Sequence, residues 1–110
     1  MNLGNAIKSL RKRKNLKQMA LADSIGISPT SLSLIESGAK QPSQETLKKI
    51  CQYLKVPQPF IYFLAMEESD VPEDRKGLYR ALEPGLKTDI ETLFLSALEP
   101  DKEDSKFKEH

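Results

Sequence analysis

The stretch QMALADSIGISPTSLSLIESG, residues 18–38, contains two short amphipathic segments on either side of Gly26. The spacing of its small residues suits two helices that pack at a steep angle. Ala22 lets the second segment approach the first closely, and Gly26 supplies the positive φ that ends the first helix. Leu32 is expected to point from the second helix back into the core. This arrangement is typical of a helix-turn-helix.

The second of these helices has clear start and stop signals. Ser28 is a good N-cap, and Pro29 falls at the first helical position, where its missing N–H costs nothing. The helix is expected to run from there to Ser37, and Gly38 stops it. Its polar residues lie on faces that point away from the core.

Helical periodicity continues on both sides of this unit. Apolar residues recur at helical spacing over residues 3–14, 44–54 and 59–66, which predicts three further helices. Cys51 falls in the apolar stripe of the helix over 44–54 and is interpreted as a packed small hydrophobe. The helix over 59–66 is more apolar than one buried face requires, so part of it is expected to meet something beyond its own domain.

The chain changes character after residue 66. Residues 67–76 are acidic and contain a proline, which predicts a linker or an exposed turn. Residues 87–98 carry a second helical signal, preceded by Pro84 and Gly85, with an apolar stripe too wide for a short helix that is stable alone. This helix must fold back onto the first domain or pair with a copy of itself. The predicted organisation is a helix-turn-helix domain over 1–66, an acidic linker over 67–76, a helical extension over 77–98 and a disordered charged tail over 99–110.

The net charge of +1 is the sum of two opposite halves. Residues 1–66 carry ten Lys and Arg against three Asp and Glu, a balance of +7. Residues 67–110 carry seven against thirteen, a balance of −6. The basic first half indicates a polyanionic partner, and the acidic second half is expected to stay away from that partner.

Several classes of protein are excluded by composition. With Cys51 as its one cysteine and His110 as its one histidine, the chain has no disulfide framework and no ordinary zinc site, and the lone thiol fits a reducing cytoplasm. No run approaches the roughly 20 apolar residues of a membrane span, and no signal peptide is expected. No histidine inside the fold, paired apolar carboxylates, Gly-rich phosphate loop or nucleophile motif is found. We therefore expect neither an enzyme nor a cofactor.

Three segments of the chain carry a resemblance to a known family. They are LKQMALADSIGIS (residues 16–28), SLSLIESGAKQPS (31–43) and ETLKKICQYLKV (45–56), in order and with matching loop lengths. Residues 3–64 resemble the five-helix DNA-binding domain of the lambda repressor/Cro superfamily, whose members are called XRE-type regulators. The resemblance implies an all-α fold, a five-helix lambda repressor-like domain with a helical C-terminal extension, and a transcriptional regulator that acts as a repressor.

The same resemblance implies roles for individual residues. Gln18 matches a residue that hydrogen-bonds DNA phosphate, and the exposed N–H groups of its helix terminus would help to hold the same anion. Arg11 and Glu36 match a salt bridge between the first and third helices, so both are assigned to the scaffold together with Ala22, Gly26 and Leu32. The residues expected on the phosphate backbone are Gln18, Lys17, Ser31, Lys40, Gln41, Arg13 and Lys14.

Sequence readout falls to the helix over 29–37, whose N-terminal residues reach base edges in the major groove. Family members often carry Gln, Asn or Arg on this face, whereas this chain offers hydroxyls, a proline ring and a leucine. These groups discriminate less than a bidentate pair, which is worth about 1–3 kcal/mol. Specificity is therefore expected to depend on dimer spacing and DNA shape. The residues expected to contact bases are Ser28, Pro29, Thr30, Ser33 and Leu34.

The leading hypothesis is a homodimer that binds a palindromic operator in double-stranded DNA, with half-sites about 34 Å apart. One alternative is a DNA-binding antitoxin whose C-terminal segment holds a toxin, and another is a restriction–modification controller. A companion reading frame beside this one in the genome would favour the antitoxin. The residues expected at the dimer surface are Phe60, Phe63, Leu86, Ile90, Leu93 and Phe94.

Overall fold

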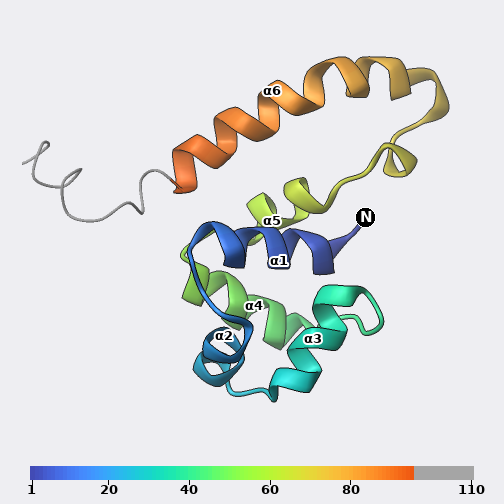
Figure 1. Cartoon of the computed structure of the whole chain (residues 1–110). Coiled ribbons are helices and arrows are strands. Elements are labelled where there is room, and N and C mark those ends of the chain that lie inside the picture. Colours follow the sequence, from blue (N-terminus) through green and yellow to red (C-terminus); the bar gives the residue numbers. More distant parts are fainter. Residues whose placement is uncertain (96–110) are drawn as a thin grey trace, which may run out of the picture.

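The computed structural model of the chain describes residues 1–95, with side chains through residue 94. The last residues of the expected extension and the expected charged tail lie outside this range. The described part is all-helical (Figure 1). Its elements are α1 (Leu3–Arg13), α2 (Gln18–Ile25), α3 (Pro29–Ser37), α4 (Gln44–Leu54), α5 (Gln58–Ala65), the short 3₁₀ turns η1 (Glu68–Asp70) and η2 (Glu73–Arg75), and α6 (Lys76–Leu95).

The first five helices enclose one hydrophobic core. Helix α1 packs against α3 and α5, while α2 packs against α3 and α4 (Figure 1). Burying each large aliphatic side chain in this core stabilises the fold by about 1.5–3 kcal/mol. The largest fully buried side chains are Ile7, Leu10, Leu21, Leu32, Leu47, Ile50, Leu54 and Ile61.

Local signals start and stop the helices of this domain. The Ser28 side chain accepts a hydrogen bond from the Ser31 N–H at 3.0 Å, and Ser43 accepts one from the Thr46 N–H at the same distance. Gly26 ends α2 with φ of 76°, a left-handed conformation that a residue with a Cβ rarely adopts. The Ser28 cap and the Gly26 stop lie where the sequence predicted them, because each depends on neighbours within a few residues.

The cysteine of α4 lies in the core. Cys51 is 3% exposed, and burial raises the pKa of its thiol to about 11. The side chain therefore stays protonated near neutral pH and is a poor nucleophile.

The last helix begins earlier than its helical periodicity indicated. Helix α6 begins at Lys76 and continues through Pro84 and Gly85, whereas the periodicity placed a helical signal only after these residues. Proline lacks the N–H of an interior helical residue and crowds the preceding turn. Contacts on both sides hold the helix across this point: Tyr79 Oη donates to the Met66 carbonyl at 3.0 Å, and Lys87 Nζ donates to the same oxygen at 3.2 Å.

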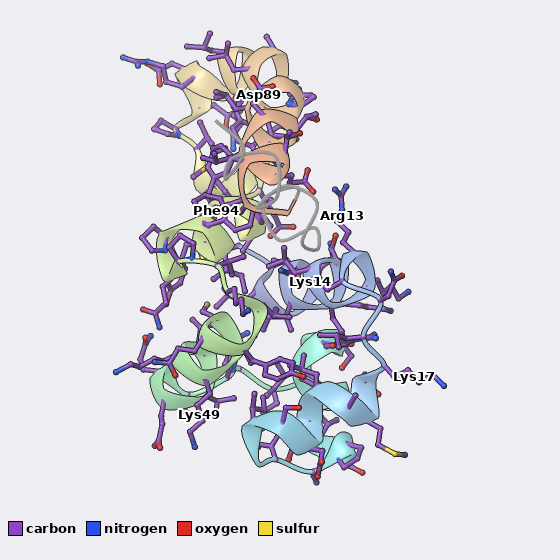
Figure 2. All side chains as sticks on the ribbon, turned by 90° about the vertical axis from the view of Figure 1, so that its left-hand side faces the viewer. Arg13, Lys14, Lys17, Lys49, Asp89 and Phe94 are labelled. Carbon is purple, nitrogen blue, oxygen red and sulfur yellow. The ribbon has the colours of Figure 1, made fainter. Side chains whose placement is uncertain are left out.

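The C-terminal part of α6 folds back on the first domain. The Phe94 ring lies 4.9 Å from the Phe60 ring between centroids, and Ile90 packs against the same core (Figure 2). Phe60 is only 4% exposed. The part of the apolar surface of α5 around Phe60 is thus covered within one chain. Phe60, Ile90 and Phe94 make intramolecular contacts where the sequence placed a dimer surface, because α6 is long enough to reach back to α5.

Within residues 1–95, none of the helices combines the length and the apolar character that a membrane crossing requires.

Candidate nucleic-acid interface

A buried ion pair joins α1 to α3 beneath the helix-turn-helix. Arg11 Nε donates to Glu36 Oε2 at 2.8 Å and Arg11 Nη2 donates to Oε1 at 3.1 Å, a bidentate geometry. Arg11 Nη1 also donates to the Leu16 carbonyl at 2.7 Å. Both charged side chains are nearly excluded from solvent, at 10% and 3% exposure. This pair sets the position of α3 against α1.

Gln18 joins the same cluster. Its Nε2 donates to Glu36 Oε1 at 3.0 Å, so the amide is oriented by the ion pair. The side chain is half-buried at the first residue of α2. The N-cap residue Lys17 makes no side-chain hydrogen bond to the N–H groups that follow it. The N-terminus of α2 thus presents backbone donors, the second amide hydrogen of Gln18 and an exposed lysine.

The close packing of α2 and α3 rests on small and buried residues. Ala22 and Leu32 are fully buried, and Gly26 turns the chain between the two helices. Gly4 was not identified from the sequence, although it lies where α1 crosses α3. A Cβ there would lie 2.9 Å from the Glu36 carbonyl oxygen, and still closer to that of Ile35. A glycine in the first turn of a helix is a weak signal, so only the packing reveals this role.

Helix α3 presents its N-terminal residues to solvent. Leu34 is 43% exposed, and its neighbours on this surface are polar or proline. One of them, Ser28, already accepts the capping hydrogen bond, which leaves its hydroxyl hydrogen and one lone pair for further contacts. The residues expected to contact bases are all exposed and come together on one end of α3: Ser28, Pro29, Thr30, Ser33 and Leu34.

The residues expected on phosphate fall into two groups. Lys17, Lys40 and Gln41 are exposed and Ser31 is half-buried, at the ends of α2 and α3. The second group, Arg13 and Lys14, lies at the end of α1, and its two side chains point toward different neighbours (Figure 2). Arg13 Nη1 forms an ion pair with Glu91 Oε2 of α6 at 2.9 Å. Lys14 is half-buried, and burial, followed by the nearby charge of Lys55, lowers the pKa of its ammonium group.

Met19 has a different role from the one its apolar character predicts. It is one of the apolar residues of α2, but its side chain is 68% exposed. It lines a hollow of about 430 Å³ together with Lys17, Pro29 and Ile27. With 3.6 residues per turn, Met19 lies beside Ala22 on the side of α2 that points away from the other buried residues, Leu21 and Ile25. The hollow therefore extends the apolar part of the surface that includes Pro29.

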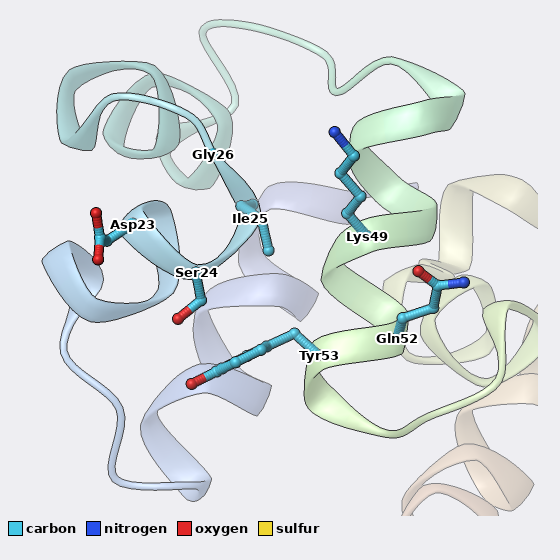
Figure 3. Close-up of a pocket in the computed structure, with 7 residues that line it drawn as sticks. All are labelled: Asp23, Ser24, Ile25, Gly26, Lys49, Gln52 and Tyr53. Atoms are coloured by element: carbon cyan, nitrogen blue, oxygen red, sulfur yellow. The ribbon is translucent and has the colours of Figure 1, made fainter.

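A second hollow, of about 600 Å³, lies between the end of α2 and α4 (Figure 3). Figure 3 shows Asp23 and Lys49 on opposite sides of it, with the Asp23 carboxylate pointing outward and the Lys49 side chain running along α4. Its polar side chains do not converge on a common point, so the hollow does not form a ligand site. Among residues 1–95, no group of three or more His, Cys, Asp or Glu side chains is placed to hold a metal ion.

These features define a helix-turn-helix DNA-binding domain. The family whose profile matches the chain is described as Helix-turn-helix, and the match covers residues 7–57. The chain belongs to the Cro/C1-type (XRE) helix-turn-helix family of DNA-binding regulators, as the sequence predicted. It is accordingly a regulator and not an enzyme.

Three curated relatives show the range of this similarity. The ImmF control region 10 kDa protein of Bacillus phage phi105 is 40% identical over 72 residues, covering 66% of this chain and 77% of the relative. The cryptic phage CTXphi transcriptional repressor RstR of Vibrio cholerae is 27% identical over 89 residues, covering 81% and 78%. Antitoxin PezA of Streptococcus pneumoniae is 44% identical over 54 residues, covering 49% of this chain but only 34% of the antitoxin.

Solved structures agree with the fold. Two crystal structures of the clp gene regulator ClgR from Corynebacterium glutamicum resemble the chain. One has a TM-score of 0.60 at 29% identity and covers 78% of this chain and 92% of its own. The other has a TM-score of 0.56 at 33% identity and covers 58% and 83%. The predicted all-α class is therefore confirmed.

Proposed function

We propose that the protein is a transcriptional repressor that binds a palindromic operator as a homodimer in the cytoplasm. The observation that carries this proposal is the exposed N-terminal end of α3, held on a scaffold that the buried Arg11–Glu36 pair locks in place. A rigid helix whose first residues face outward fits the major groove of B-DNA. The names of the phi105 and CTXphi relatives support a role in phage-type control.

In this proposal the phosphate contacts fix the domain on the duplex. Lys17 and the N-terminus of α2 hold one phosphate, with the second amide hydrogen of Gln18 as an additional donor. Because Glu36 orients that amide, the contact costs little side-chain entropy. Lys40 and Gln41 hold the backbone beyond the other end of α3. Arg13 contributes less than its charge alone would predict, because Glu91 already neutralises it.

In this proposal each side chain that contacts a base discriminates only weakly between base pairs. Thr30 and Ser33 donate or accept single hydrogen bonds, and Leu34 and Pro29 offer apolar contact to thymine methyl groups. The exposed Met19 adds an apolar contact that the sequence did not predict. Such a surface discriminates weakly at each base pair, so the operator is selected through the spacing of two half-sites and through DNA shape.

Selection of bound duplexes from a random DNA pool tests the proposal directly. The selected sites are expected to be two-fold symmetric, with half-sites about one helical turn apart. Enrichment without any symmetry would contradict the homodimer on a palindrome, and no enrichment over an input pool at physiological salt would contradict sequence-specific binding altogether.

The selected operator then allows the reading face to be tested. Replacing Thr30 and Ser33 together with alanine is expected to weaken operator binding about tenfold, because two hydrogen bonds to bases are lost. Binding to an unrelated duplex should change by less than about twofold, since phosphate contacts remain. Titration of both duplexes by fluorescence anisotropy measures the two losses, and Ser9→Ala, on the exposed face of α1, is the matched control. Equal losses on both duplexes would argue against base reading.

A second candidate function is a DNA-binding antitoxin. The similarity to antitoxin PezA and the acidic second half of the chain favour it. Co-purification would distinguish the antitoxin from the repressor. An antitoxin should co-purify with a protein that is encoded beside it and that binds to residues 77–98. Because the match covers only 34% of that antitoxin, we propose the repressor function in preference to the antitoxin function.

A further inference from the structure

Helix α6 has two apolar faces, and only one of them is covered within the chain. Tyr79, Ile90 and Phe94 turn inward toward the first domain. A second face carries leucines with four-residue spacing that remain about half exposed: Leu78 (55%), Leu82 (50%) and Leu86 (47%), followed by Leu93 (62%). With 3.6 residues per turn, these leucines form one stripe beside the covered face.

The leucine stripe borders a hollow on the same side of the molecule. Leu78, Leu82 and Leu86 line a groove of about 270 Å³ together with Phe63 and Met66 of the α5 end. The groove, whose lining also includes the charged residues Arg75 and Glu83, and the stripe form a continuous, mainly apolar surface of the kind that rarely stays exposed on a monomer.

Two opposite charges flank this stripe. Arg75 precedes Leu78 by three residues, and Asp89 follows Leu86 by three residues. Asp89 lies on the leucine side of α6 by the same periodicity, and Arg75 is the last residue of η2, directly before α6. Both residues are exposed, and Arg75 Nε lies 3.9 Å from Oδ2 of the neighbouring Asp74 in an exposed ion pair. They are 14 residues apart, or about 21 Å along the axis, so they cannot pair within one chain.

We propose that the stripe is covered by the α6 of a second copy, antiparallel to the first, with the two-fold axis passing beside Leu82. In this register Leu82 meets its own copy, and Leu78 of each chain meets Leu86 of the other. Arg75 of each chain then lies opposite Asp89 of the other, so both ends of the stripe are closed by an ion pair. The partner's leucines also cover Phe63, which the sequence assigned to a dimer surface.

The charges select this register over its neighbours. A shift by one helical turn in one direction places Arg75 opposite Leu93, and a shift in the other direction moves Asp89 beyond Lys76, the first residue of α6, so that no α6 residue faces it. Either shift loses both ion pairs, and the first opposes a charge to an apolar side chain. A parallel pair would bring Arg75 beside Arg75 and Asp89 beside Asp89, which is repulsive.

The location of α6 suits this pairing. Helix α6 lies on the far side of α1 and α5 from α2 and α3, so a second copy on α6 leaves the reading face uncovered (Figure 1). The inference rests on the homodimer of the proposed function and names its surface.

Thiol cross-linking tests the axis. Leu82→Cys is expected to give a covalent dimer with a short bismaleimide, because the two thiols face one another across the axis. Thr88→Cys is the matched control, since residue 88 is also exposed on α6 but lies away from the stripe. Native Cys51 is buried and contributes only background in the wild-type protein. Equal cross-linking at residues 82 and 88 would overturn the assignment.

Charge reversal tests the register. Arg75→Glu and Asp89→Arg should each raise the dimer dissociation constant about five- to tenfold in sedimentation equilibrium without DNA. The double variant should restore the wild-type value, which no contact within one chain can explain. A double variant as weak as the single ones would refute the register, as would a wild-type protein that sediments as a monomer throughout the micromolar range.

The outcomes also separate this inference from the proposed function. Suppose that the wild-type protein is a dimer, that Arg75→Glu leaves its dissociation constant unchanged and that Leu82→Cys gives no more covalent dimer than Thr88→Cys. This result would refute the α6 surface and leave the homodimer in place. A protein that is monomeric alone but binds an asymmetric selected site would refute both. A different protein captured on the leucine stripe in place of the second copy would refute the inference and favour the antitoxin function.

Discussion

Replacing Glu36 with alanine is expected to lower the free energy of unfolding by about 3–5 kcal/mol. The substitution leaves the Arg11 guanidinium buried without its anion, and it removes three hydrogen bonds, two from Arg11 and one from Gln18. An uncompensated buried charge costs more than the pair itself contributes, because desolvation is no longer offset by attraction. The loss should appear as a lower urea midpoint with an unchanged slope.

The matched control is Glu45→Ala. Glu45 also forms an ion pair with a basic residue, Lys49, at 3.5 Å, but both side chains are largely exposed. Exposed pairs contribute about 0–1 kcal/mol, so this variant should lose little stability. If Glu36→Ala lost no more than Glu45→Ala, the buried pair would not be the element that sets α3 against α1.

The second large effect is expected at Gly4. An alanine there would place its Cβ against the carbonyl oxygens of Ile35 and Glu36, which belong to the backbone of α3 and cannot rotate away. Relief requires α1 and α3 to move apart, and overpacking of this kind costs about 1–3 kcal/mol and occasionally more. The same movement separates Arg11 from Glu36. We therefore expect a loss of about 3 kcal/mol in urea unfolding.

Gly77→Ala provides the comparison for this variant. Gly77 is likewise the second residue of its helix, but a Cβ there meets nothing within 4 Å. Since alanine favours helix more than glycine does, this variant should be neutral or slightly more stable. Similar losses for the two variants would show that helix propensity, and not the close approach of α1 and α3, governs both.

Much of the first domain could be predicted because its signals are local. The caps at Ser28 and Ser43, the left-handed Gly26 and the apolar spacing of α1 to α4 involve neighbours a few residues apart. The exposed end of α3 follows from the same periodicity. The pairing of Arg11 with Glu36 came from the family resemblance alone, since 25 residues separate the two and periodicity cannot connect them.

The candidate site was predicted less completely than the fold. Met19 is apolar and lies in a helix with buried neighbours, but its angle around α2 exposes it, which its hydrophobicity alone does not indicate. Arg13 is part of a basic run and reads as a phosphate contact, yet Glu91, 78 residues later, neutralises it. In both cases the outcome depends on which surface a neighbouring element covers.

The sequence by itself determined the helix-turn-helix, its start and stop points, its family and the basic character of its half of the chain. These properties follow from short-range periodicity, capping and composition. The tertiary structure alone decided that α6 continues through Pro84, that Phe94 covers Phe60, that Gly4 must lack a side chain, and that the leucines of α6 stay exposed. The physical reason is that burial is a property of packed pairs of elements, and a periodic stripe shows that a face is apolar without showing what covers it.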